Sequence, residues 1–201
     1  MSYSSFTLDS VKTEFELEID VPTNLFCDVA PVAPSAHLTT ELERNVPVAL
    51  AIGTEKAKSE MIVGDVLLEL REHFDRRISL FSGIDFNVDA EKGLTGVCDF
   101  LVSLSPVSFV LEAPIIVLVE AKKDDLLQGI GQCVAEMIAA QQFNAKKANS
   151  IPYIYGVSTT GADWRFLKLD GQKLHIDTEF YSIHGCDKIL GILSSMVEQK
   201  A

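Results

Sequence analysis

An aliphatic run that ends abruptly in charge is the feature that most constrains how this chain can fold. Residues 115–119 read Ile-Ile-Val-Leu-Val and are followed by Glu120, Ala121, Lys122 and Lys123. Five consecutive aliphatic residues predict a strand buried on both faces, and such a strand needs a sheet that is covered by helices on each side. Because side chains alternate along a strand, Glu120 and Lys122 are predicted to share one face at its end.

The rest of the chain predicts helices and strands in an order that fits this sheet. Apolar residues at helical spacing predict helices over about residues 36–45, 55–74, 124–148 and 187–199. Ser35 and Thr54 are the expected N-caps of the first two. Extended segments are predicted over residues 78–88, 94–104, 114–121 and 152–160. A hairpin turning at Asp170 and Gly171 follows them. The order of the core, helix, three strands, helix, strand, hairpin, helix, predicts an α/β fold with a mixed central sheet flanked by helices.

Length and composition favour one globular domain. The chain has 201 residues, of which 47% are hydrophobic and 23% charged, enough to bury a sizeable core. Residues 1–50 are predicted to form an N-terminal arm with a short helix packed on the core, and residues 51–201 the domain itself. No apolar stretch approaches the roughly 18 residues of a membrane span, and the N-terminus lacks a signal-peptide pattern. A cytoplasmic protein without a membrane partner is therefore expected.

A second carboxylate is predicted to lie beside Glu120. Asp99 interrupts another apolar strand 21 residues upstream, a separation that suits neighbouring antiparallel strands. Two buried carboxylates oppose each other's ionisation, and a divalent cation resolves that conflict. Both carboxylates, the backbone carbonyl of Ala121 and waters would make the oxygen shell that Mg²⁺ prefers, with Mn²⁺ as a substitute. Lys122 beside such an ion would orient a water or neutralise charge on a phosphate, as metal-assisted phosphodiester hydrolysis requires.

Two helices contribute further candidates. On a helical wheel of about 100° per residue, Glu60 falls at the margin of the apolar stripe, so it can face the sheet. The alternative is a solvated helix glutamate, which is the expectation for its neighbour Glu55. Gln128 and Gln132 lie one turn apart on the later helix. Their amides would hold a water, a carboxylate or a phosphate, or else bridge backbone groups. Trp164, on the predicted hairpin, is expected in the core; base stacking, with Arg165 beside it, is the alternative.

These motifs together resemble the PD-(D/E)XK nuclease superfamily, whose members have a restriction-endonuclease-like fold. The stretch GVCDF, which contains Asp99, looks like the family's metal-binding aspartate motif, and VEAK, residues 119–122, looks like its Glu-x-Lys element. Glu60 resembles the acidic residue that many members place on the first core helix, and Gln132 resembles a glutamine of the later helix. The resemblance spans about residues 55 to 177.

The resemblance departs from the family pattern at two positions. Cys98 replaces the proline before the aspartate, and Glu136 stands where a tyrosine often follows the helix glutamine by one turn. What the resemblance implies is a metal-dependent nuclease that acts on DNA. The implied catalytic residues are Asp99, Glu120, Lys122, Glu60 and Gln132, and the implied metal ligands are Asp99, Glu120, Glu60 and the carbonyl of Ala121.

The charge balance supports an alternative function. The formal net charge is −12, which works against nonspecific attraction to a polyanion. The same fold would then serve as a catalytically inactive or regulatory binding module. Acidic residues around the site would favour that module, whereas local basic pairs there would favour the nuclease; these pairs are Arg76–Arg77, Lys122–Lys123 and Lys146–Lys147.

Two further possibilities follow from the same residues. A glycosidase with two carboxylates is disfavoured, because Lys122 beside Glu120 has no role in that chemistry. The last predicted helix has an apolar face that would serve either the core or a homodimer contact. Its residues are Ile189, Leu190, Leu193, Met196 and Val197.

Overall fold

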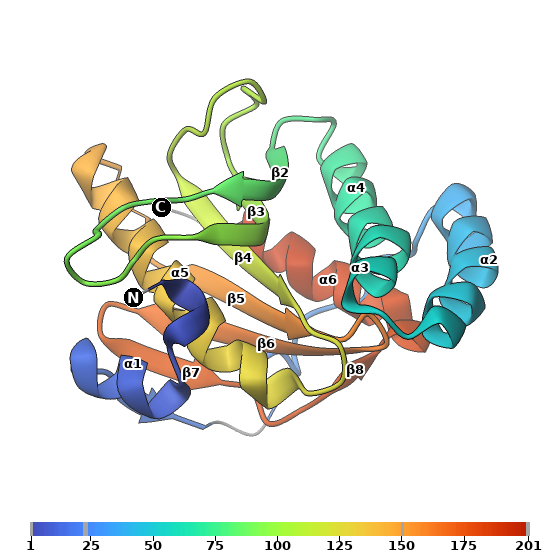
Figure 1. The fold of residues 1–201 in the computed structure, drawn as a ribbon. Coiled ribbons are helices and arrows are strands. Elements are labelled where there is room, and N and C mark those ends of the chain that lie inside the picture. Colours follow the sequence, from blue (N-terminus) through green and yellow to red (C-terminus); the bar gives the residue numbers. More distant parts are fainter. Residues whose placement is uncertain (1, 22–23, 150, 200–201) are drawn as a thin grey trace.

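A computed structural model describes residues 2–21, 24–149 and 151–199 of the chain (Figure 1). The strands are β1 (Glu18–Asp20), β2 (Ser79–Asp85), β3 (Val97–Ser103), β4 (Ile115–Ala121), β5 (Ile154–Thr159), β6 (Asp163–Asp170), β7 (Lys173–Ile176) and β8 (Tyr181–Ser182). The α-helices are α1 (Leu8–Glu14), α2 (Ala36–Ile52), α3 (Glu55–Lys58), α4 (Gly64–His73), α5 (Leu126–Lys146) and α6 (Cys186–Val197). Short 3₁₀ turns lie at Tyr3–Ser5 and Ile183–Gly185, and a π-helical turn, η2, at Ser59–Val63.

Within the described residues, eight strands form one mixed sheet with helices on both faces, so the predicted α/β class is confirmed. The strand order is β1-β7-β6-β5-β4-β3-β2, with β8 beside β6. β4 is flanked by β3, which is antiparallel to it, and by β5, which is parallel. All of its residues are buried, as the aliphatic run predicts. None of the helices in the described ranges is long and apolar enough to cross a membrane.

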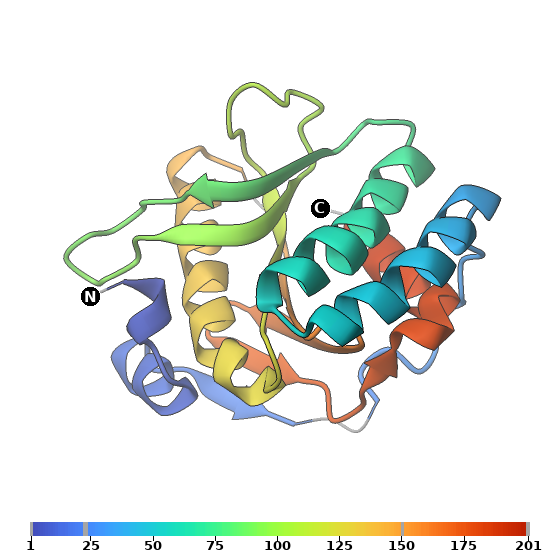
Figure 2. The same cartoon turned by 45° about the vertical axis from the view of Figure 1, so that its right-hand side comes forward.

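Two hydrophobic cores lie on opposite faces of the sheet. Helices α4 and α6 cover one face, with α2 packed outside α4, and helices α1 and α5 cover the other (Figures 1 and 2). The apolar face of α6 belongs to the first core, and all of the residues predicted for it are buried there. That face therefore stabilises the protein's own fold and is not free to contact a second copy.

The N-terminal arm is integral to the fold. β1 extends the sheet by pairing in parallel with β7. α1 packs on α5 at Gly131, where a Cβ would lie 2.5 Å from the carbonyl carbon of Thr7. Ser35 caps α2 as predicted, since its hydroxyl accepts the Leu38 N–H. This helix continues to Ile52, so the predicted boundary at residue 50 falls inside it.

The predicted hairpin is present, but its turn is displaced by one residue. Asp170 pairs with Lys173, so the turn is formed by Gly171 and Gln172 rather than by Asp170 and Gly171. Gly171 has a φ of 58°, a left-handed conformation that glycine adopts without strain.

The helix predicted to start after Thr54 contains the π-helical turn. The Thr54 hydroxyl accepts the Ala57 N–H, so the predicted N-cap is confirmed. At η2 the Gly64 N–H donates to the Ser59 carbonyl, five residues earlier. A turn closed in this way contains one residue more than an α-helical turn. The side chains of α3 are therefore rotated relative to those of α4, compared with a continuous α-helix.

Candidate functional site

The carboxylates of Asp99 and Glu120 come together where β3 and β4 lie side by side. Phe100 pairs with Val119, which places the residues next to them, Asp99 and Glu120, on neighbouring strands at the same level. Asp99 Oδ2 accepts a 2.9 Å hydrogen bond from the Ala121 N–H. The Glu120 side chain is only 2% exposed, so its carboxylate is withdrawn from solvent although it lies near the end of the strand.

Lys122 provides the nearest positive charge. Its Nζ donates to Glu120 Oε1 and lies 3.3 Å from Oε1 of Gln132. Gly129 of α5 makes room for it, since a Cβ there would lie 2.9 Å from Lys122 Cγ and 2.6 Å from Ser158 Oγ. The second carboxylate oxygen of Glu120, Oε2, is buried without a hydrogen-bond partner among the described residues. The site therefore contains a buried acceptor that the protein itself leaves unsatisfied.

Burial dominates the electrostatics of this cluster. Burial and the neighbouring Asp99 raise the pKa of Glu120 from 4.5 to about 8, against the opposing effect of Lys122. Burial also raises the pKa of Asp99, although the Ala121 N–H and Lys122 act in the other direction. Burial is the largest single influence and acts to lower the pKa of Lys122, but the carboxylates of Glu120, Glu55 and Asp99 together outweigh it and the net change is upward. One lysine thus faces more acidic groups than it can balance, a situation that favours a bound cation.

Gln132 links this cluster to a buried acid that the sequence did not identify as part of the site. Its Nε2 donates to Glu136 Oε1 at 3.1 Å. Glu136 is fully buried, and burial together with Glu120 raises its pKa well above the usual value. Its Oε2 also has no hydrogen-bond partner within the described ranges. The sequence signal that could have identified Glu136 is its spacing, one helical turn after Gln132. The side chain of Gln128 lies outside the described part of the structure.

Glu60 does not join the cluster. Its carboxylate pairs with Lys56 Nζ at 2.7 Å and the side chain is 61% exposed, so the expectation that it faces the sheet is wrong. The wheel assumed a regular α-helix, whereas Glu60 lies within the π-helical turn, where that angular spacing does not hold. Glu55 is exposed, as expected, and its charge makes the smallest of the contributions that act on the pKa values of Asp99 and Glu120.

Asp99, Glu120 and the Ala121 carbonyl are the groups that could hold a divalent cation. Among the described residues, no group of three or more His, Cys, Asp or Glu side chains is arranged to hold a metal ion. A cation here would depend on two carboxylates and would complete its shell with water and substrate oxygens, as Mg²⁺ commonly does. The unpartnered Oε2 of Glu120 fits this arrangement, because buried acceptors normally have a donor or a cation.

Most of the predicted basic pairs lie away from the site. Lys146 donates to a backbone carbonyl and Lys147 lies over the Phe143 ring, both at the end of α5 that is remote from Lys122. Arg76 pairs with a glutamate at the end of α4. The 21 residues of α5 span about 31 Å, so these cations do not surround the carboxylates. Of the three pairs, only Lys122–Lys123 is at the site.

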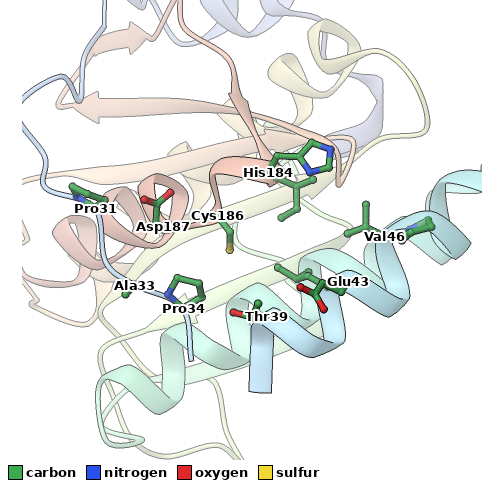
Figure 3. Close-up of a pocket in the computed structure, with 12 residues that line it drawn as sticks. Pro31, Ala33, Pro34, Thr39, Glu43, Val46, His184, Cys186 and Asp187 are labelled. Atoms are coloured by element: carbon green, nitrogen blue, oxygen red, sulfur yellow. The ribbon is translucent and has the colours of Figure 1, made fainter. Parts of the chain in front are cut away.

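A groove of about 700 Å³ opens directly beyond β4 and is lined by residues of α3, the β4–α5 loop, the β5–β6 turn and Phe180. A second groove, of about 770 Å³, lies between α2, the Pro31–Pro34 segment and the start of α6 (Figure 3). None of the predicted site residues lines the second groove. Its thiol, Cys186, has a pKa raised to about 12 by burial, so it stays protonated and is a poor nucleophile near neutral pH.

Comparison of the chain with protein-family models, curated proteins and solved structures gives no match.

Proposed function

We propose that the protein is a metal-dependent nuclease with a restriction-endonuclease-like core that hydrolyses phosphodiester bonds in DNA. The observation that carries the proposal is the buried Glu120 carboxylate beside Asp99 and Lys122, with one of its oxygens unpartnered among the described residues. Burying such a group is costly, and strongly perturbed carboxylates of this kind concentrate at functional sites. The element order of the sheet and helices supports the same proposal.

The roles follow from the contacts. Mg²⁺ or Mn²⁺, held by Asp99, Glu120 and the Ala121 carbonyl, would supply Lewis-acid stabilisation of the phosphate and acidify a water. Lys122 Nζ would donate to a phosphate oxygen or orient the attacking water. Gln132 keeps Lys122 in position through its amide oxygen. Glu60 has no part in this arrangement.

The proposal is tested by incubating the purified protein with single-stranded, double-stranded and branched DNA in Mg²⁺ or Mn²⁺. Cleavage is expected, and Asp99→Asn and Lys122→Ala should each reduce it by about 10²-fold or more. Lys173→Ala is the matched control, because Lys173 pairs with Asp20 on β1, away from the candidate site. If no DNA is cleaved, or if Lys122→Ala cleaves as well as the wild type, the proposal is wrong.

A catalytically inactive or regulatory binding module of the same fold is the second candidate. It is favoured by the net charge of −12 and by the position of Glu55, which adds a third acid near Asp99 and Glu120. This candidate predicts that the protein binds Mn²⁺ in calorimetry, and loses that binding in Glu120→Gln, while cleaving none of the DNA substrates. Metal-dependent cleavage that requires Lys122 would rule it out.

A further inference from the structure

We propose that the groove beyond β4 is a base pocket, in which an unpaired nucleobase stacks on Phe180 while the phosphate of the same strand lies at Asp99, Glu120 and Lys122. The inference rests on the proposed function and adds a substrate class: single-stranded or locally unpaired DNA. At about 700 Å³ the groove has the size of an ordinary small-ligand site.

Two elements connect the base pocket to the carboxylates. Lys123, in the pocket wall, directly follows Lys122, and consecutive Cα atoms are about 3.8 Å apart. On α3, the charge of Glu55 contributes to the raised pKa of Glu120. Lys58, three residues later on the same helix, lines the pocket. Residues three apart lie on the same side of a helix. A strand whose phosphate lies at the carboxylates therefore has a base within reach of the pocket.

The apolar part of the pocket forms a stacking platform. Phe180 and Leu127 both line it, and their side chains are 54% and 61% exposed. The Arg165 guanidinium lies over one face of the Phe180 ring, 3.9 Å from its centre, and because the side chain remains 54% exposed we place the base on the other face. Aromatic rings backed by arginine are a common platform for unpaired bases. Trp164 cannot take this role, because it is fully buried as the sequence predicts.

The charges of the pocket suit a base rather than a phosphate. Asp124 lies between Lys58 and Lys123, with oxygen–nitrogen distances of 3.5 and 3.8 Å, so its charge is balanced within the protein. Asp125 accepts a backbone N–H at the start of α5 and acts as its N-cap. Asp163 is exposed and can accept a hydrogen bond from the exocyclic amine of an unpaired adenine, guanine or cytosine. In a duplex both faces of a base are stacked on its neighbours, so a paired base cannot stack on Phe180 and the pocket discriminates against paired DNA.

Binding measurements that avoid cleavage test the base pocket directly. The full chain is titrated into a fluorescein-labelled single strand and into the matching duplex, with Ca²⁺ in place of Mg²⁺, and anisotropy is recorded. A single strand carrying 2-aminopurine reports stacking through quenching of its fluorescence. Tighter binding of the single strand and quenching are expected. Phe180→Ala should weaken single-strand binding by about 5- to 150-fold, the equivalent of one base stack, and should remove the quenching.

Phe109→Ala is the matched control, because Phe109 is fully exposed on the β3–β4 loop and does not line the pocket. Leu127→Ala provides a second pocket variant at an exposed position. The base pocket is refuted if the duplex binds as tightly as the single strand, or if Phe180→Ala behaves like Phe109→Ala. The base pocket and the proposed function are refuted by different results. Binding that depends on Phe180, without cleavage of any DNA, would support the base pocket and refute the nuclease. Cleavage that depends on Lys122 but not on Phe180 would support the nuclease and refute the base pocket. Absence of binding to either DNA refutes the base pocket, whereas only the cleavage assay can refute the proposed nuclease.

Discussion

Replacing Glu120 by glutamine should remove a pH-dependent instability from the folded protein. The pKa of Glu120 is raised from 4.5 to about 8, first by burial and then by Asp99. Between these two pH values the folded protein keeps a proton that the unfolded chain has released. The folded state then binds more protons than the unfolded state, so the free energy of unfolding falls as the pH rises through this window.

The size of the effect follows from the same two values. Each pKa unit corresponds to about 1.4 kcal/mol, so ionising Glu120 in the folded protein costs on the order of 4 to 5 kcal/mol of stability. For a chain of this length, 1 kcal/mol changes the melting temperature by about 2–4 °C. Between about pH 5 and about pH 8, the melting temperature of Glu120→Gln should therefore rise relative to wild type by on the order of 10 °C.

Thermal denaturation of both proteins across this pH range measures the difference. Glu60→Gln is the control, because Glu60 is an exposed partner of Lys56 and its loss should leave a curve parallel to wild type. Added Mn²⁺ should stabilise the wild type most at the higher pH, where Glu120 is ionised, and should have little effect on Glu120→Gln. Parallel pH profiles for wild type and Glu120→Gln would show that ionising the buried Glu120 carboxylate does not lower the free energy of unfolding.

Three further substitutions test individual contacts. Gly129→Ala places a Cβ 2.9 Å from Lys122 Cγ and should cost about 1–3 kcal/mol in urea denaturation; an unchanged midpoint would show that α5 can move away. Glu136→Gln keeps the hydrogen-bonding shape of a group whose pKa is raised by burial, so equilibrium denaturation near pH 7 should show no loss, and a loss above about 2 kcal/mol would contradict this. Glu55→Gln should weaken Mn²⁺ binding in calorimetry more than Glu60→Gln, and equal effects would remove Glu55 from the site.

The fold was predictable where the signal is local. The aliphatic run of β4 predicted burial on both faces, and the hydroxyl caps at Ser35 and Thr54 start α2 and α3 as expected. The pairing of β1 with β7 was not predicted, because it joins segments about 150 residues apart and no local pattern encodes it. The continuation of α2 to Ile52 was also missed, because Pro47 is a residue that usually ends a helix. The helix continues past it and packs Ala49 in the core.

In the candidate site, too, the residues placed by local sequence patterns were predictable and those placed by long-range contacts were not. Asp99 and Glu120 could be placed together, because strand alternation holds over a few residues and β3 and β4 stay in register from Phe100 to Val102, before the shift at Ser103. Glu136 could not, since most helix glutamates are solvated and its burial depends on the contact of α5 with the sheet. The place of Phe180 in the groove beyond β4 was not predicted, because the chain between β7 and β8 carries no periodic pattern and nothing in the sequence links it to the end of β4.

The π-helical turn accounts for the difference between the predicted and the observed position of Glu60, which lies within it and is exposed. Val66 and Leu67 of α4 pack in the core, whereas α3 lies at the groove beyond β4. With the extra residue of the π-helical turn between them, α4 packs in the core and Lys58 of α3 lines the groove beyond β4. Turns of this kind are energetically poorer than α-helix and are frequent at functional sites. The π-helical turn therefore links the packing of this helix to the position of the proposed site.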